Sequence, residues 1–180
     1  MREITIQIED ATPDTIRPYG VFVGSADTTR TFAAWPGTTV FGEYPIKVET
    51  GGEILLVQTG AKSFPHKIAI IERHFQHTQT YLPFNGKPFV MILGTETEDG
   101  APVLDKLRAF RFDGQAGIIL AEQVWHDFPY AIEDDTQFAV VLSNISHIND
   151  LTEPLHPMEA EGPDLERRSV QARAVLSVAF

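Results

Sequence analysis

Cysteine is absent from the 180-residue chain, which excludes disulfide bridges, thiolate zinc sites and a cysteine nucleophile. The sequence also lacks any apolar run near the roughly 18 residues that a membrane-spanning helix needs. Its opening, MREITIQIED, has neither the apolar core nor the cleavage pattern of a signal peptide. We therefore expect a cytoplasmic protein with no membrane partner, in which any metal ion is bound by histidine, carboxylate or amide groups.

Positive charge is scarce as well. The 14 lysines and arginines are scattered among 25 acidic residues, which gives a formal net charge of −11. A polyanion would be repelled overall, so nucleic acid is excluded from the expected partners.

Repeats, low-complexity tracts and long linkers are also missing, so we expect one domain over residues 1–180. Twelve prolines and 13 glycines interrupt the chain at short intervals, as turns between strands do. Nine segments rich in β-branched and aromatic residues are predicted as strands, over residues 2–8, 20–22, 53–59, 67–73, 80–83, 89–93, 107–112, 117–121 and 138–143. Nine short strands indicate an all-β sandwich or barrel.

Helices are predicted only near the two ends. Thr12, Pro13 and Asp14 favour a short helix, because threonine caps well and proline suits the first helical position. Residues 163–176 have acidic side chains first and basic ones later, which matches the helix dipole and predicts a C-terminal helix packed on the barrel or on a partner chain. The polar, proline-containing residues 144–161 are interpreted as an irregular surface segment.

The polar residues most suggestive of chemistry lie between two predicted strands. Alternation along a strand places Glu72 and His74 on one face, and Gln79 and Tyr81 share a face beyond the connection. If the first face points into a barrel, a carboxylate, an imidazole and an amide converge there. His126, which follows an apolar strand and a turn, could join them only through the fold.

The spacing of these residues resembles the first motif of the cupins, which runs His-x-His, three or four residues, Glu, six residues, Gly. Here Glu72, His74, Gln79 and Gly86 occupy those positions, so two of the three polar ligands are replaced. The second motif, Pro-x-Gly-x-x-His, retains only its histidine, His126.

Six short runs, in order, resemble ureidoglycolate lyases more specifically. They are Glu72-Arg73-His74, Thr78-Gln79-Thr80, Pro83, Gly86-Lys87-Pro88-Phe89, Leu107-Arg108-Ala109-Phe110 and Val124-Trp125-His126. The earlier run Ile16-Arg17-Pro18-Tyr19-Gly20 resembles the opening of that family, so the similarity extends over about residues 12–141.

The resemblance implies a cupin-type double-stranded β-helix, or jelly-roll barrel, that forms a homodimer. It also implies cleavage of ureidoglycolate to glyoxylate and urea in purine (allantoin) breakdown. The chain departs from the family at residues 119–123, where Ile-Leu-Ala-Glu-Gln replaces the polar run Asn-Tyr-His-Arg-Gly. Asp127 stands where a second histidine is frequent, and Leu142 and Ser143 replace an Asp-Arg pair. A different substrate for the same type of enzyme therefore stays open.

Three residues are predicted to be catalytic: His74, His126 and Glu72. An imidazole titrates near neutrality and suits proton transfer, so His126 or Glu72 would take the substrate hydroxyl proton and His74 would give one to the leaving nitrogen. The sequence does not decide which residue is base and which is acid. Structural histidines, and an ion pair between Glu72 and an arginine, are the ordinary alternatives.

Four further residues are predicted to contact the substrate: Gln79, Arg108, Tyr81 and Trp125. Gln79 would orient it by hydrogen bonds, and Arg108 would clamp a carboxylate. The alternatives are a surface position for Arg108, and wall or core positions for Tyr81 and Trp125. The remaining histidines and one lysine fall outside the motif spacing and are expected to be structural or solvated: His66, His77, His147, His156 and Lys87.

His74, Gln79 and His126 could also hold a divalent metal ion. The set is incomplete, because glutamine is a poor ligand and a second motif histidine is missing, so the pattern requires no cofactor. Three functions therefore remain: a lyase acting on ureidoglycolate or a similar small hydroxy acid, a cupin enzyme acting on another sugar acid or hydroxy acid, and a non-catalytic cupin that binds a small ligand.

Overall fold

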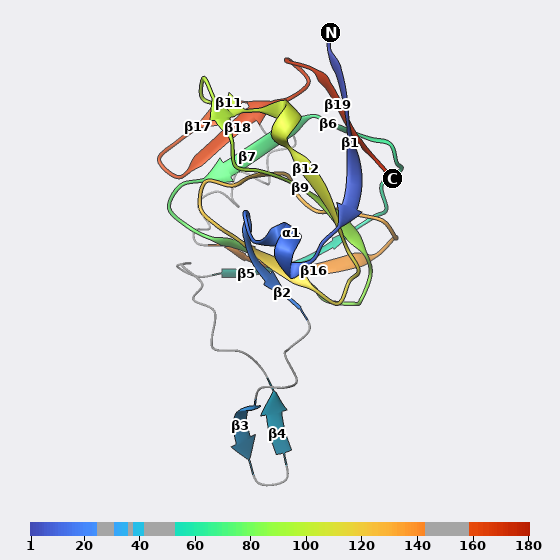
Figure 1. Ribbon diagram of the computed structural model, residues 1–180, viewed down its shortest axis with the longest axis vertical. Helices are drawn as coiled ribbons and strands as arrows, with labels where there is room; N and C mark the ends of the chain where they lie inside the picture. The colour runs from blue at the N-terminus through green and yellow to red at the C-terminus, as the bar shows by residue number, and fades with distance from the viewer. Residues whose placement is uncertain (25–30, 36–37, 42–52, 143–158) are drawn as a thin grey trace.

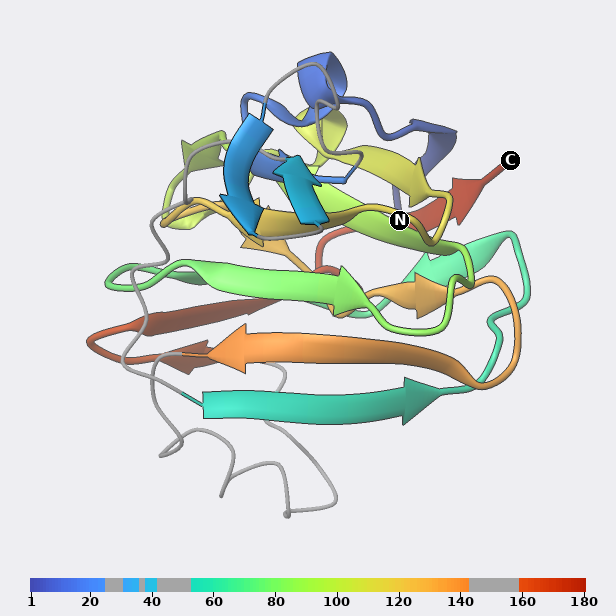
Figure 2. The same cartoon turned by 90° about the horizontal axis from the view of Figure 1, so that it is seen from below.

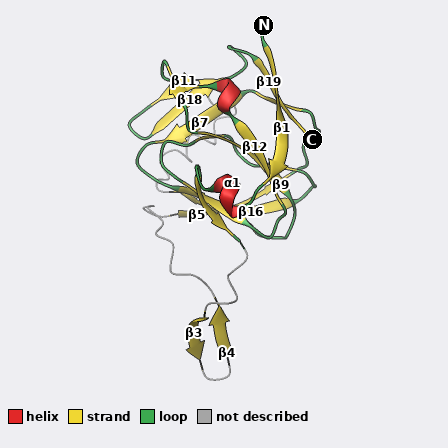
Figure 3. Ribbon diagram, in the orientation of Figure 1, coloured by secondary structure: helices red, strands yellow, loops and turns green. Residues whose placement is uncertain are grey.

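The computed structural model of the chain describes residues 1–24, 31–35, 38–41, 53–142 and 159–180 (Figure 1). These residues are mostly strands with two short helical segments (Figure 3). The predicted all-β class, a cupin-like jelly roll, is confirmed. Among the described residues no helix has the length and apolar content needed to cross a bilayer.

The larger sheet has the strand order β17-β18-β7-β14-β9-β12-β1-β19-β6, with β15 paired to β9. Its strands are β17 (Ala160–Glu161), β18 (Leu165–Ser169), β7 (Ile70–His74), β14 (Trp125–His126), β9 (Phe89–Gly94), β12 (Arg108–Phe112), β1 (Glu3–Asp10), β19 (Val175–Ala179), β6 (His66–Ile68) and β15 (Tyr130–Ala131). Only Ala69 separates β6 from β7 in the chain, although five strands lie between them in the sheet. The sheet therefore curls strongly and forms a half-barrel.

The second sheet has five strands in the order β2-β13-β8-β16-β5, of which β8, β16 and β5 lie side by side in Figure 2. They are β2 (Gly20–Val23), β13 (Gly117–Leu120), β8 (Gln79–Pro83), β16 (Thr136–Leu142) and β5 (Glu53–Thr59). The remaining elements are the pairs β3 (Thr31–Trp35) with β4 (Thr38–Phe41) and β10 (Thr97–Glu98) with β11 (Ala101–Pro102), the helix α1 (Pro13–Ile16) and the 3-10 turn η1 (Leu104–Lys106). All nine predicted strands are found, with the one predicted at 67–73 divided at Ala69.

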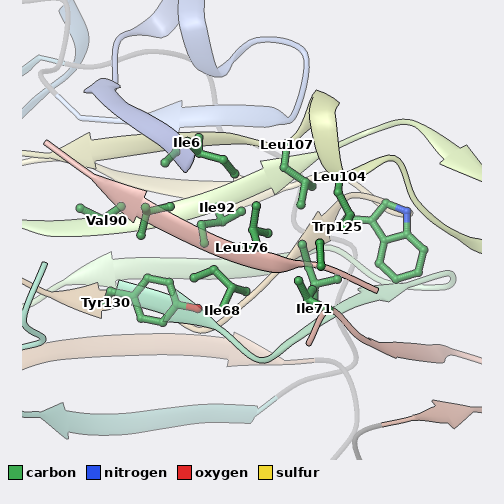
Figure 4. Close-up of a cluster of buried hydrophobic side chains, with 14 residues drawn as sticks. Ile6, Ile68, Ile71, Val90, Ile92, Leu104, Leu107, Trp125, Tyr130 and Leu176 are labelled. Carbon is green, nitrogen blue, oxygen red and sulfur yellow. The ribbon is translucent and has the colours of Figure 1, made fainter. Parts of the chain in front are cut away.

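Strand β9, in the middle of the larger sheet, is buried on both faces. On β9, Phe89 and Leu93 face one apolar cluster, whereas Val90 and Ile92 face another. The inner cluster, which includes residues of both sheets, consists of Ile16, Tyr19, Tyr81, Phe89, Met91, Leu93, Phe110, Phe112, Ala116, Ile118, Leu120, Val124, Phe138 and Val140. The outer cluster, within the curl of the larger sheet (Figure 4), consists of Ile6, Ile68, Ile71, Val90, Ile92, Leu104, Leu107, Ala109, Trp125, Tyr130, Val170, Ala174, Leu176 and Val178. Two buried faces explain why β9 is apolar throughout rather than alternating.

The predicted N-terminal helix is confirmed as α1. The Thr15 N–H donates to the Thr12 hydroxyl oxygen at 3.2 Å, and the Thr12 N–H donates back to the Thr15 hydroxyl oxygen at 2.8 Å. This reciprocal capping satisfies two backbone donors that the helix leaves unpaired. Ile16, at the end of the helix, is buried in the inner cluster.

The predicted C-terminal helix over residues 163–176 is wrong, because the chain forms β18 and β19 there. The order of charges stabilises a helix by only about 0.3–1 kcal/mol per charge. Leu176 and Val178 instead enter the outer cluster, where burial of each contributes about 1.5–3 kcal/mol. Long-range pairing thus outweighs the local preference. Of the predicted surface segment 144–161, residues 144–158 lie outside the described residues, and Ala160–Glu161 forms β17.

Candidate active site

Five of the predicted site residues converge between the two sheets. Glu72 and His74 lie on β7, and His126 lies opposite Glu72 in the paired strand β14. Directly opposite residues of an antiparallel pair share a face. Gln79 and Tyr81 come from β8 of the facing sheet, and Tyr81 belongs to the inner cluster.

The distances define a compact polar cluster. His126 Nε2 is 2.6 Å from Gln79 Oε1, and the ring centroids of His74 and His126 are 5.5 Å apart. Glu72 Oε1 is 3.9 Å from His74 Nε2, and the Tyr81 ring centroid is 6.4 Å from that of His126. Two imidazoles that are far apart in the sequence therefore lie close together, with an amide group beside one of them.

His74 has no hydrogen-bond partner for either ring nitrogen among the described residues, although the side chain is only 9% exposed. Burial, reinforced by the neighbouring His126, lowers the pKa of His74 to about 3, so the ring is neutral near pH 7. Buried polar atoms in folded proteins are nearly always paired. The unpaired nitrogens favour a position that receives a group from outside the chain.

The protonation of His126 follows from its neighbours. Its Nδ1 is 2.8 Å from the Val124 carbonyl oxygen, which can only accept, so Nδ1 carries a hydrogen. Burial lowers the pKa of His126, which leaves a lone pair on Nε2. A lone pair and the Gln79 amide oxygen repel each other at 2.6 Å. A neutral ring therefore requires Gln79 to turn its NH₂ group toward Nε2, or a cation to lie between the two atoms.

Glu72 is held by an arginine from β18. Arg167 donates from Nε at 2.9 Å and from Nη2 at 2.6 Å to the same oxygen, Glu72 Oε2. Burial raises the pKa of Glu72, but attraction from His126 and Arg167 outweighs it, and the pKa is lowered overall. Glu72 is therefore an ionised carboxylate, better suited to orienting a partner than to taking up a proton.

Asp127 lies directly after His126 and was identified from the sequence only as a departure from the family. It accepts a hydrogen bond from the Phe128 N–H at 2.7 Å and another from the Tyr130 hydroxyl. Burial raises the pKa of Asp127 to about 6, and the charge of Glu72 contributes to the rise. A carboxyl group that titrates near neutrality suits acid–base chemistry.

His77 falls outside the motif spacing, yet it lies beside His74. Its ring centroid is 4.3 Å from that of His74, and its Nδ1 is 2.6 Å from Asp164 Oδ2. Its Nε2 is buried without a partner among the described residues. A histidine three residues after His74 was a signal that could have been used, whereas Asp164 is too distant in the sequence to be linked to it.

Trp125 and Arg108 are not brought to the cluster. Trp125 points to the opposite face of β14, in the outer cluster, and its Nε1–H donates to Thr97 Oγ1 at 2.9 Å (Figure 4). Arg108 shares a face with His126 but is two strands away, about 10 Å at the usual strand spacing. Its guanidinium group is hydrogen-bonded to Glu9, and its side chain is 44% exposed.

Comparison with known proteins agrees with the motifs. A family model described as Ureidoglycolate lyase matches residues 3–161. The chain belongs to the ureidoglycolate lyase family. Proteins named ureidoglycolate lyase from Pseudomonas putida and Pseudomonas entomophila are each 29% identical over 142 residues, which cover 76% of this chain and 83% of the relative. The protein of that name from Brucella anthropi is 29% identical over 142 residues, and the match covers 82% of its length.

The predicted family and the predicted enzyme class, a lyase, are thereby confirmed. The match to the ureidoglycolate lyase family ends at residue 161. Asp164 and Arg167 therefore lie beyond it, in a part of the chain that the family model does not describe.

Two overlapping groups in this family member could ligate a metal ion. Glu72, His74 and His126 form one, and His74, His77 and Asp164 form the other; within each, the potential ligand atoms lie within 4.8 Å of one another. The unpaired nitrogens of His74 fit such an ion. The oxygen of Gln79 facing the lone pair of His126 fits it as well, because a cation would relieve their repulsion.

A separate cleft of about 230 Å³ lies near one end of β1 and is lined by seven residues: Asp10, Ala11, Phe22, Arg111, Phe112, Asp113 and Ala116. None of these residues belongs to the polar cluster. The lining has no imidazole to transfer a proton, so the histidine cluster is the candidate active site of this ureidoglycolate lyase family member.

Proposed function

We propose that the protein cleaves ureidoglycolate, or a similar small hydroxy acid that carries a ureido group, to glyoxylate and urea. The observation that carries this proposal is the buried and unpaired imidazole of His74, set beside His126 in a chain of the ureidoglycolate lyase family. The names of the relatives support the substrate.

The chemistry needs one proton acceptor and one proton donor. Ureidoglycolate is a hemiaminal: its hydroxyl proton is removed, the carbon becomes an aldehyde as the bond to nitrogen breaks, and the departing urea nitrogen takes up a proton. Neutral His74 is the proposed acceptor, since its pKa of about 3 leaves it without a proton to give. Asp127, with a pKa of about 6, is the proposed donor.

The remaining polar groups would orient the substrate. Burial, with repulsion from Glu72 and Asp127, raises the pKa of Tyr81, so its hydroxyl remains a hydrogen-bond donor. Gln79 offers an amide that can donate or accept. Ionised Glu72 would stabilise the positive charge that His74 gains when it takes the proton, and His126 stays a proposed member of the catalytic set through its contact with Gln79.

A divalent metal ion is an alternative to His74 as proton acceptor, because the single lone pair of a neutral imidazole cannot bind a metal ion and take up a proton. Glu72, His74 and His126 would hold it, with Gln79 as a fourth ligand. Such an ion would supply Lewis acidity that polarises a substrate oxygen. Elemental analysis of the purified protein, together with activity before and after chelation, tests whether it is required.

We also propose that the protein acts in the cytoplasm as a homodimer and contributes to the breakdown of allantoin. The similarity of its motifs to the family supports these points. Light scattering coupled to gel filtration would test the dimer, and a particle of one chain mass would contradict it.

The proposed reaction is tested by incubating purified protein with racemic ureidoglycolate and measuring urea and glyoxylate separately against the spontaneous background. We expect equal amounts of the two products. The substitution His74→Asn should reduce the rate by about 10²–10⁴-fold, the usual contribution of a positioned acid or base. A wild-type protein that releases neither product above background contradicts the proposal.

An apolar wall favours a second candidate, an enzyme acting on another hydroxy acid. Leu120 lies opposite Gln79 in the pairing of β13 with β8, and Ile119 lies opposite Thr80. Leu120 belongs to the inner cluster beside the site, so a substrate with an apolar substituent is accommodated there. Stabilisation by small hydroxy acids in a thermal-shift screen, with turnover that releases no urea, would select this candidate.

A further inference from the structure

The segment that follows the family match contributes to the candidate site. In β18, Arg167 lies opposite Glu72 and Leu165 lies opposite His74 of β7. Opposite residues of an antiparallel pair point to the same face. Arg167 therefore reaches the polar cluster from a part of the chain that begins after residue 161.

Arg167 fixes one oxygen of Glu72 and leaves the other available. Both of its hydrogen bonds, at 2.9 and 2.6 Å, end on Oε2, while Oε1 lies 3.9 Å from His74 Nε2. The Arg167 side chain is 11% exposed, so the pair is largely shielded from solvent. A charge-assisted contact of this kind sets the direction in which the carboxylate points.

Asp164 similarly fixes the orientation and tautomer of His77. Its Oδ1 accepts from the backbone N–H groups of Phe75 at 3.2 Å and Gln76 at 2.7 Å, and its Oδ2 contacts His77 Nδ1 at 2.6 Å. A carboxylate oxygen accepts, so the imidazole hydrogen lies on Nδ1. The lone pair of His77 Nε2 is then left unpaired among the described residues, with the His74 ring as a neighbour.

Strand β18 is also attached by contacts other than these two. On the opposite face of the strand, Glu166 is paired with Arg73 at 2.6 Å and also with Arg168. Backbone pairing with β7 continues from Leu165 to Ser169. That face and the backbone hold the strand as well. The side chains of Arg167 and Asp164 can therefore orient Glu72 and His77.

We propose that this C-terminal segment is a working part of the active site, in which Arg167 and Asp164 are positioning residues for Glu72 and His77. His77, held with its lone pair on Nε2, accepts a hydrogen bond from the ureido N–H of the substrate. The inference rests on the proposed lyase function. It adds that the substrate must place an N–H group, as hydrogen-bond donor, opposite His77 Nε2.

The contact from Arg167 is tested with Arg167→Gln and Arg167→Lys, using Arg168→Gln as the matched control on the opposite face of the same strand. Misplacement of a catalytic group by about 1 Å can reduce a rate by about 10²-fold, so we expect kcat of Arg167→Gln to fall about 10–100-fold. Arg167→Lys should recover part of the loss, and Arg168→Gln should keep the wild-type kcat. Circular dichroism and melting temperatures show whether each variant is folded.

The contact from Asp164 is tested with Asp164→Asn, which has nearly the same shape. The asparagine oxygen can still accept from the backbone N–H groups of Phe75 and Gln76, while its NH₂ group donates to His77 Nδ1. The imidazole hydrogen must then move to Nε2, and the acceptor becomes a donor. We expect kcat/KM for ureidoglycolate to fall about 10–100-fold, the loss of about one to two hydrogen bonds to a buried polar group, with little change in melting temperature.

The outcomes separate this inference from the function on which it rests. A wild-type protein that releases neither urea nor glyoxylate refutes the proposed function and the inference with it. An active wild type whose folded Arg167→Gln and Asp164→Asn variants keep their kinetic constants refutes the inference alone. A loss in Arg168→Gln as large as in Arg167→Gln also refutes it, because the effect would then come from disturbing β18 as a whole.

Discussion

The two faces of strands β7, β14 and β18 differ in how completely their polar atoms are paired. On the outer face, Trp125 packs in the apolar cluster and donates to Thr97. Arg73 is stacked 4.5 Å from the Trp125 ring and is paired with Glu166. On the inner face, both nitrogens of His74 lack partners among the described residues.

Because side chains alternate along a strand, the same short stretches of sequence serve both faces. The outer face contributes apolar burial and paired charges, which stabilise the fold. The inner face holds buried groups that lack partners among the described residues, and such groups reduce stability. Alternate residues of one strand thus either stabilise the fold or line the candidate site. Substitutions on the outer face should mainly change stability, and substitutions on the inner face should mainly change activity.

The largest expected effect on stability is on the outer face. Trp125→Ala removes a fully buried indole, and we expect it to lower the free energy of unfolding by about 3–5 kcal/mol. Urea denaturation followed by circular dichroism measures the change. Any loss of lyase activity should follow the unfolded fraction, so the protein that remains folded keeps the wild-type kcat. A stable variant with a reduced kcat would place Trp125 in the active site. It would contradict the distinction between a stabilising outer face and a catalytic inner face.

The alternation of side chains along β14 could have been predicted from the sequence. Trp125 and His126 are adjacent on one strand, so they had to face opposite sides, and both could not contact the substrate. The strands themselves were predictable because β-branched and aromatic residues lie between turn-forming ones. That Glu72, His74 and Gln79 lie near one another was predictable because their spacing follows a known motif.

Pairing between distant segments was not predictable in the same way. Nothing local in residues 165–169 indicates that they lie beside β7, and their charge order favours a helix. Arg167 and Asp164 therefore entered the site only with the structure. His77 was set aside for the related reason that its partner, Asp164, lies 87 positions further along the chain.

The next effect concerns Asp127, which follows His126 directly in the chain. The pKa of this carboxyl group is about 6 in the folded protein against 3.8 for a free group. Between these pH values the folded state holds a proton that the unfolded state has released, so the contribution of Asp127 to stability is greatest below about pH 4 and is lost as the pH rises to about 6. The loss above pH 6 amounts to about 2–3 kcal/mol.

The substitution Asp127→Asn removes this titration. We expect the stability of the variant relative to the wild type to rise by about 2–3 kcal/mol between pH 4 and 6, as measured by urea denaturation at a series of pH values. The difference between the two proteins isolates Asp127, because all other groups are shared. If the free energy of unfolding varies with pH in the same way in both proteins, the pKa of Asp127 is not raised in the folded state.

His74 should show a smaller effect of opposite direction. Its pKa is about 3 in the folded protein against 6.5 for a free imidazole, so the unfolded state binds a proton below pH 6.5 that the folded state does not. Stability therefore falls as the pH drops from 6.5, by about 2 kcal/mol at pH 5. In His74→Asn the difference in stability between pH 7.5 and pH 5 should shrink by that amount. An unchanged difference would show that His74 has a partner and belongs with the paired groups.

The smallest effect is expected at Arg108. Its side chain points to the same face as His126 but lies outside the polar cluster. Its guanidinium group is already bound by Glu9, and exposed ion pairs contribute about 0–1 kcal/mol. We therefore expect Arg108→Gln to change stability by less than about 1 kcal/mol and to leave KM for ureidoglycolate within about twofold, since a guanidinium group two strands from His126 does not reach the cluster. Steady-state kinetics would decide. A tenfold rise in KM, about 1.4 kcal/mol, would mean that Arg108 leaves Glu9 to bind the substrate carboxylate, and the active face would then extend across β9 to β12.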